Sequence, residues 1–256
     1  MQSKNVVARI ESRDNKHKDE HVIYTGHWDH LGKTEEGGQS HIFNGAVDNA
    51  SGIAALLEIA RTFAAEQKTL KRSVLFIAVT AEEKGLLGSK YYADTPLYPL
   101  KNAVANLNVD ALQPWGKTKD IQVIGSGQTT IEELVEHNAK GQGRYVVADS
   151  RPESGGYFRS DHFNLVQKGV PALFLKGGTE VVGKPEGYGV QKSKEYGGQH
   201  YHKEGDEIKP DWDASGFAQD AELYYLIGRD LARDLKNVEF KEGSEFKAVR
   251  QQLRGN

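Results

Sequence analysis

The sequence contains no cysteine. Disulfide bonds and thiolate metal sites are therefore excluded, and any metal site has to use histidine, aspartate or glutamate. No apolar run approaches the roughly 18 residues that a membrane-spanning helix needs, so we expect no membrane span. No block of lysine and arginine is long enough to form a nucleic-acid surface, and the formal net charge is -3. We therefore expect no nucleic-acid partner.

A signal peptide is also lacking, because the first four residues lead directly into a strand-like segment. We expect that a leader or a further domain is missing from this chain. The 256 residues are 38% apolar and 27% charged, which is typical of a globular chain. This length is sufficient for one large domain with a full core.

Strand-like and helix-like segments alternate over the middle of the chain. The expected strands are 5–10, 21–25, 73–79, 103–109, 121–124, 144–148 and 170–175. The expected helices are 53–65, 86–93, 217–235 and two that begin near 129 and 160. This alternation predicts one α/β domain over residues 1–256, with a mainly parallel mixed β-sheet covered by helices on both faces.

Two details of the topology also follow from the pattern. Strands 5–10 and 21–25 are joined by a polar loop, which predicts an antiparallel hairpin at an edge of the sheet. Residues 177–200 are rich in glycine, lysine and tyrosine and show no periodicity. This stretch is therefore predicted to be a long loop near the active site.

Glu82 and Glu83 follow the apolar segment 73–79, which has the character of a buried strand. In an open α/β sheet, ligands bind at the carboxyl ends of the strands. Neighbouring residues on an extended backbone point in opposite directions, so the two carboxylates are expected to have different roles. Which of them has which role is not decided by this pattern.

Four further side chains occupy comparable places at strand ends, before a helix or after a loop: His27, Asp48, Asp110 and His202. Two histidines and three carboxylates suit two borderline cations such as zinc, with one carboxylate bridging them. Two metals about 3.5–4 Å apart can share a water and polarise a carbonyl. Asp29 lies two residues after His27, and its carboxylate is expected to orient the His27 ring.

Six segments of the chain carry a family resemblance. They are 25–32, 45–52, 80–89, 106–110, 160–163 together with 169–171, and 201–202. Taken together and in this order, they resemble the co-catalytic di-zinc aminopeptidases of the aminopeptidase Y type, whose relatives include glutaminyl cyclases and glutamate carboxypeptidases. The resemblance implies the α/β fold of the zinc aminopeptidases, which is phosphorylase/hydrolase-like.

The resemblance also implies a set of ligands for two zinc ions per chain. His27 and Asp110 would bind one ion, Glu83 and His202 would bind the other, and Asp48 would bridge them. Cobalt or manganese would suit the same ligands.

The same resemblance implies that Glu82 is the general base for a water activated by the two metals. Tyr201 would donate a hydrogen bond to the oxyanion. Asp161 and His162 match a family motif, and either helix capping or support of the ligands accounts for them. His30 is a candidate to line the site.

The activity implied is that of a zinc-dependent metallo-exopeptidase that removes N-terminal amino acids from a peptide or a small amino-acyl substrate. A glutaminyl cyclase and an acidic carboxypeptidase are the alternatives on the same fold. The carboxypeptidase needs an arginine-lined pocket, for which Arg151 and Arg159 are candidates. Asp206 is a candidate support for His202. By resemblance we expect a secreted or periplasmic protein.

Overall fold

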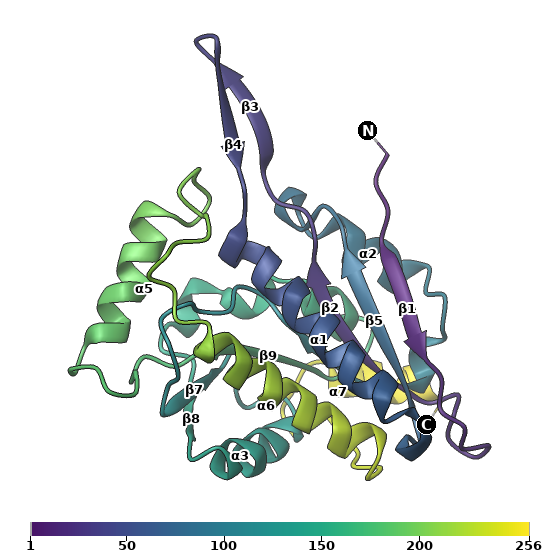
Figure 1. Ribbon diagram of the computed structural model, residues 1–256. Helices are drawn as coiled ribbons and strands as arrows, with labels where there is room; N and C mark the ends of the chain where they lie inside the picture. Colours follow the sequence, from purple (N-terminus) through teal and green to yellow (C-terminus); the bar gives the residue numbers. More distant parts are fainter. Residues whose placement is uncertain (1, 256) are drawn as a thin grey trace.

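A seven-stranded mixed β-sheet lies at the centre of the computed structural model, which describes residues 2–255 (Figure 1). Its strands are β1 (Val6–Ile10), β2 (His21–His27), β5 (Ser73–Val79), β6 (Ala103–Asn108), β7 (Asp120–Val123), β8 (Tyr145–Ala148) and β9 (Ala172–Gly177). The spatial order is β1-β5-β2-β6-β9-β7-β8. The four strands β5, β2, β6 and β9 run parallel, whereas β1 and β7 are antiparallel to their partners β5 and β9.

Helices cover both faces of this sheet. The α-helices of residues 2–255 are α1 (Gly52–Ala65), α2 (Leu87–Asp94), α3 (Ile131–Gly141), α4 (His162–Val166), α5 (Tyr188–Gln199), α6 (Ser215–Ala232) and α7 (Lys247–Arg254). Apolar residues of α1, α3 and α6 form one core cluster with the sheet, and those of α2 and α4 form a second cluster. The mainly parallel sheet with helices on both faces confirms the predicted fold class.

The central strands are apolar on both faces because both faces are buried. In β2, Val22 and Tyr24 belong to the cluster with α1 and α6, while Ile23 belongs to the cluster with α2. In β5, Phe76 and Ile77 divide between the two clusters in the same way. Side chains alternate along a strand, so a continuous apolar run supplies two cores at once.

The predicted hairpin of the first two strands is wrong. Strand β1 is an antiparallel edge strand, as expected, but it pairs with β5, and β5 separates it from β2. A periodic pattern identifies a strand without identifying its neighbour. The segment 32–43 instead forms a hairpin, in which β3 (Gly32–Glu36) pairs with β4 (Gln39–Phe43). This hairpin projects from the body of the molecule (Figure 1).

The stretch 177–200 is also more regular than the sequence predicts, because it contains helix α5. Gly189 is the one buried residue of this helix. A helix that buries so little has no apolar stripe, and therefore gives no 3.6-residue periodicity to detect. The helix lies at the periphery of the molecule (Figure 1) and leads to His202.

Candidate metal centre

Three neighbouring parallel strands end at one edge of the sheet, and each end is followed by a potential metal ligand. His27 is the last residue of β2, Glu83 lies in the turn after β5, and Asp110 lies two residues after β6. Because β2 lies between β5 and β6, these three side chains meet above adjacent strand ends. Asp48 joins them from the turn Ala46–Ser51, which precedes α1.

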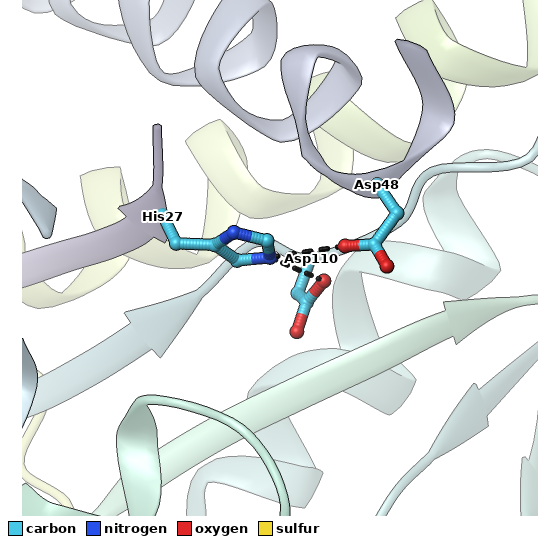
Figure 2. A group of neighbouring side chains, drawn as sticks. All are labelled: His27, Asp48 and Asp110. Atoms are coloured by element: carbon cyan, nitrogen blue, oxygen red, sulfur yellow. Dashed lines mark ion pairs between the residues drawn. The ribbon is translucent and has the colours of Figure 1, made fainter. Parts of the chain in front are cut away.

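The first group of ligands consists of His27, Asp48 and Asp110. The Nε2 atom of His27 lies 3.0 Å from Oδ1 of Asp48 and 3.4 Å from Oδ1 of Asp110. Figure 2 shows the imidazole pointing at the two carboxylates. One ligand atom from each residue lies within 4.8 Å of the others, so the group could hold one cation.

The second group shares Asp48 with the first. The Nε2 atom of His202 lies 3.1 Å from Oε2 of Glu83 and 3.2 Å from Oδ2 of Asp48. The two oxygens of Asp48 therefore face different histidines, one in each group. The structure brings together all five side chains that the resemblance implies as ligands.

His30 also belongs to this second group, although in the sequence it was only a candidate to line the site. Its Nδ1 atom lies 2.8 Å from Oε1 of Glu83, and its side chain is buried. Gly45 provides the space for this ring, because a Cβ atom there would lie 2.6 Å from Cγ of His30. The available sequence signal was the spacing of His27 and His30, which lie three residues apart across the end of β2.

Unpartnered buried atoms support the fit of a cation. Nε2 of His27, Nδ1 of His30 and Oε1 of Glu83 make no hydrogen bond within residues 2–255, although each lies within about 3 Å of an atom of the opposite character. Buried polar atoms normally have a partner. The donors are imidazole nitrogens and carboxylate oxygens, which is a set that zinc accepts.

Charge complementarity within the site is strong. Burial acts to lower the pKa of His27, but Asp110 and Asp48 outweigh it and hold this pKa far above the usual range. Burial acts to raise the pKa of Asp48, but His202 and His27 hold it below its usual range. Three clustered carboxylates thus favour positive charge in the space between them, whether it is a proton or a metal ion.

Glu82 and Tyr201 lie beside the ligands. Burial, together with the negative charge of Asp110, raises the pKa of Glu82 to about 9. Burial also holds the pKa of Tyr201 above its usual range, so its hydroxyl remains a hydrogen-bond donor at neutral pH. The Tyr201 ring stacks on His202 with 3.8 Å between the ring centroids, and it is 40% exposed.

Buried hydrogen bonds hold Asp110 in place. The Ser160 hydroxyl donates to Oδ2 of Asp110 at 2.5 Å and accepts from the Asn108 amide at 2.8 Å. Asn108 accepts in turn from the Thr25 hydroxyl at 2.7 Å. This chain of polar contacts crosses from β2 to β6, so the sheet itself orients the carboxylate.

Asn49 connects the Asp48 turn to the chain around Asp110. Its side-chain amide donates to the Val109 carbonyl at 3.0 Å, and its oxygen accepts from the amides of Gly52 and Ala111. The two carboxylates that face His27 are therefore positioned relative to one another by a single buried side chain. The sequence analysis did not identify Asn49.

The carboxylate of Asp29 was predicted to orient the His27 ring, and this prediction is wrong. The backbone carbonyl of Asp29 lies 3.0 Å from Nδ1 of His27, and its carboxylate accepts from the Glu82 amide at 3.4 Å. The side chain thus supports the Glu82 turn, because the tight loop after β2 brings the backbone oxygen nearer to the ring.

The structure excludes helix capping, one of the two explanations given for Asp161. Asp161 precedes α4 but makes no capping hydrogen bond, and neither of its carboxylate oxygens has a hydrogen-bond partner among residues 2–255. Burial raises its pKa to about 7. His162 packs against Phe174 and Tyr157, and burial lowers its pKa to about 4.

Three further candidates are placed by the structure. Asp206 is buried, but it hydrogen-bonds to the backbone of the Asp48 turn and not to His202. Arg151 and Arg159 are exposed, and neither forms an ion pair among the described residues. They do not form an arginine-lined pocket in this structure.

Comparison with known proteins agrees with this arrangement of strand ends and ligands. A sequence model of peptidase family M28 matches residues 5–226. The chain therefore belongs to peptidase family M28. Over 171 residues it is 30% identical to the aminopeptidase YwaD of Bacillus subtilis, covering 65% of this chain and 31% of that protein.

Solved structures with the same fold include a zinc aminopeptidase from Bacillus subtilis, with a TM-score of 0.67 and 24% identity. That alignment covers 95% of this chain and 52% of the other. A glutaminyl cyclase from an Acidobacteriales bacterium aligns with a TM-score of 0.59 and 17% identity, over 90% of this chain and 74% of the other. The chain thus spans about a third of the curated relative and about half of the aminopeptidase structure.

Proposed function

We propose that this chain is a zinc-dependent metallo-exopeptidase that removes N-terminal amino acids from peptides. The observation that carries the proposal is the convergence of two imidazoles and three carboxylates on one space, with Glu82 beside them. Membership of a peptidase family and similarity to an aminopeptidase support the choice of a peptide substrate.

Two ions per chain are proposed, because the ligands divide into two groups. His27 and Asp110 would hold one ion, Glu83 and His202 the other, and Asp48 would serve both through its two oxygens. Zinc is preferred because the donor set suits it, and because a relative from Pyrenophora teres is named a probable zinc metalloprotease. When bound, zinc lowers the pKa of water and polarises a carbonyl.

Glu82 is proposed as the general base. Burial and the negative charge of Asp110 raise its pKa to about 9. Divalent cations at the ligands would lower this value toward the range in which a carboxylate can accept a proton and return it to the leaving nitrogen. Its backbone amide is held by Asp29, which keeps the carboxyl beside the ligands.

Tyr201 is proposed to donate to the oxyanion, because its hydroxyl stays protonated and its ring is anchored on His202. A free α-amine on the substrate can approach the carboxylates of the site and would restrict cleavage to the first residue. A blocked amine should therefore abolish binding in the productive orientation.

The test combines metal analysis with a panel of amino-acid anilides and an N-acetylated control. We expect about two zinc ions per chain, release of the first residue from free-amine substrates, and none from blocked ones. Chelation should remove activity, and added zinc should restore it. Equal hydrolysis of blocked and free substrates would contradict the proposal.

The same experiment decides between the exopeptidase and a glutaminyl cyclase, whose fold this chain shares. One zinc per chain, together with cyclisation of a peptide with N-terminal glutamine, would favour the cyclase.

None of the helices in residues 2–255 is both long and apolar enough to cross a membrane. A secreted or periplasmic location is proposed on the family resemblance.

A further inference from the structure

Asp206 lies four residues after the ligand His202 and is almost completely buried. Its Oδ1 atom accepts from the Val47 amide at 2.9 Å, and its Oδ2 atom accepts from the Asp48 amide at 3.1 Å. The backbone carbonyl of Asp206 accepts from the Ala46 amide at 3.0 Å. Three successive amides of the Asp48 turn thus bind one residue of the His202 segment.

We propose that Asp206 is a positioning residue that fixes the separation of Asp48 and His202. The term Asp206 clamp denotes its carboxylate together with the amides of Val47 and Asp48. His202 and Asp206 belong to one compact turn, which the Asp206 amide closes on the Lys203 carbonyl at 3.1 Å. Anchoring one end of this turn therefore places the imidazole at its other end.

The links between the chain before the Asp48 turn and the His202 segment are weaker because they are exposed. His41 lies 3.0 Å from Glu204, and Asn44 donates to Glu207 at 2.8 Å, but water competes for both contacts. Asp206 has no cation within ion-pair distance among residues 2–255. The position of this buried carboxyl group thus depends on its hydrogen bonds, because a buried polar group needs partners.

The clamp has one further donor, from the peripheral helix α5. The Tyr196 hydroxyl donates to Oδ2 of Asp206 at 3.1 Å. Val47, Tyr196 and Asp206 also line a cavity of about 130 Å³, so apolar packing does not enclose the carboxylate on that side. Hydrogen bonds therefore determine its orientation, and they link α5 to the metal centre.

The substitution Asp206→Asn tests the clamp with nearly unchanged shape. An amide can accept from one of the two backbone N–H groups, but its NH₂ then faces the other donor. In the metal-free protein we expect faster hydrogen exchange over residues 45–50. We also expect the zinc dissociation constant to rise about 10–100-fold, with turnover recovering at saturating zinc.

Two matched controls separate positioning from general destabilisation. Asp211→Asn removes an exposed carboxylate from the same loop and should leave exchange and zinc affinity unchanged. Tyr196→Phe should weaken zinc binding roughly 2–10-fold, the value of one hydrogen bond, whereas Tyr188→Phe on the same helix should not.

The identity of the cation rests on the proposed function, whereas the clamp is tested in the metal-free protein. If wild-type protein fails to bind zinc or to release amino acids, the proposed function fails and the exchange result still decides the clamp. The inference would be overturned if residues 45–50 exchanged hydrogen in Asp206→Asn at the same rate as in Asp211→Asn. Faster exchange without any change in zinc affinity would also overturn it.

Discussion

The substitution Glu82→Gln removes the proposed base while keeping the size of the side chain. Glu82 lies in the turn after β5, and its amide donates to Asp29 in either variant. Because Glu83 is the neighbour that contacts His30 and His202, the ligand set should be unaffected. We expect the variant to bind the same amount of zinc as the wild type.

The expected loss of turnover is about 10²–10⁴-fold, the usual contribution of a positioned general base. This range corresponds to roughly 3–5 kcal/mol of transition-state free energy, at 1.36 kcal/mol for each factor of ten. The loss should be mainly in kcat, since Glu82 is proposed to act on the water and not on substrate binding.

The assay measures kcat and KM with an amino-acid anilide, alongside zinc content by elemental analysis. A metal-loaded, inactive protein supports the assignment. Activity within a few-fold of wild type would refute the role of Glu82. Loss of zinc from Glu82→Gln would show that the two neighbouring glutamates have exchanged roles, and Glu83→Gln serves as the comparison.

Three further predictions concern the supports of the site. Gly45→Ala places a Cβ against the buried His30 ring at a φ of 64°, whereas the control Gly38→Ala has a φ of 78° but open space around it. Thermal unfolding should therefore show a free energy of unfolding that falls by about 1–3 kcal/mol more in Gly45→Ala than in the control. Ser160→Ala removes the hydroxyl that contacts Asn108 and Asp110, so its free energy of unfolding should fall by about 1–3 kcal/mol and its zinc affinity should drop. The control Ser150→Ala, at an exposed residue, should change neither quantity. Burial lowers the pKa of His162 to about 4, below the unfolded value near 6.5, so its contribution to stability is present above pH 6.5 and is lost as the pH falls toward 4. His162→Gln should therefore unfold with a weaker dependence on pH between 6.5 and 4; an identical dependence would contradict this.

The sequence alone determined the fold class and the ligand candidates. The apolar run 73–79 identified a strand buried on both faces, because its side chains supply two cores. The residues at strand ends identified His27, Asp110 and the pair Glu82 and Glu83, because parallel strands deliver their carboxyl ends to one edge. The family resemblance chose Glu83 as the ligand of that pair. These inferences depend on local patterns, which persist in the folded chain.

Only the tertiary structure decided how the site is supported. Asp29 was expected to act through its carboxylate, and it contacts His27 through its backbone oxygen. Asp206 was expected to support His202, and it binds the backbone of a turn 158 residues away in sequence. Such contacts depend on which donor and acceptor atoms lie close together in the folded chain, and residue spacing in the sequence does not reveal this.

The same reason explains the errors in topology. Strand β1 pairs with β5 and not with β2, because pairing depends on the whole arrangement of the sheet. Helix α5 has no apolar stripe, so its existence depends on contacts that no periodic pattern records. The sequence by itself thus determined which residues can carry the chemistry, while the folded structure determined which atoms hold them in position.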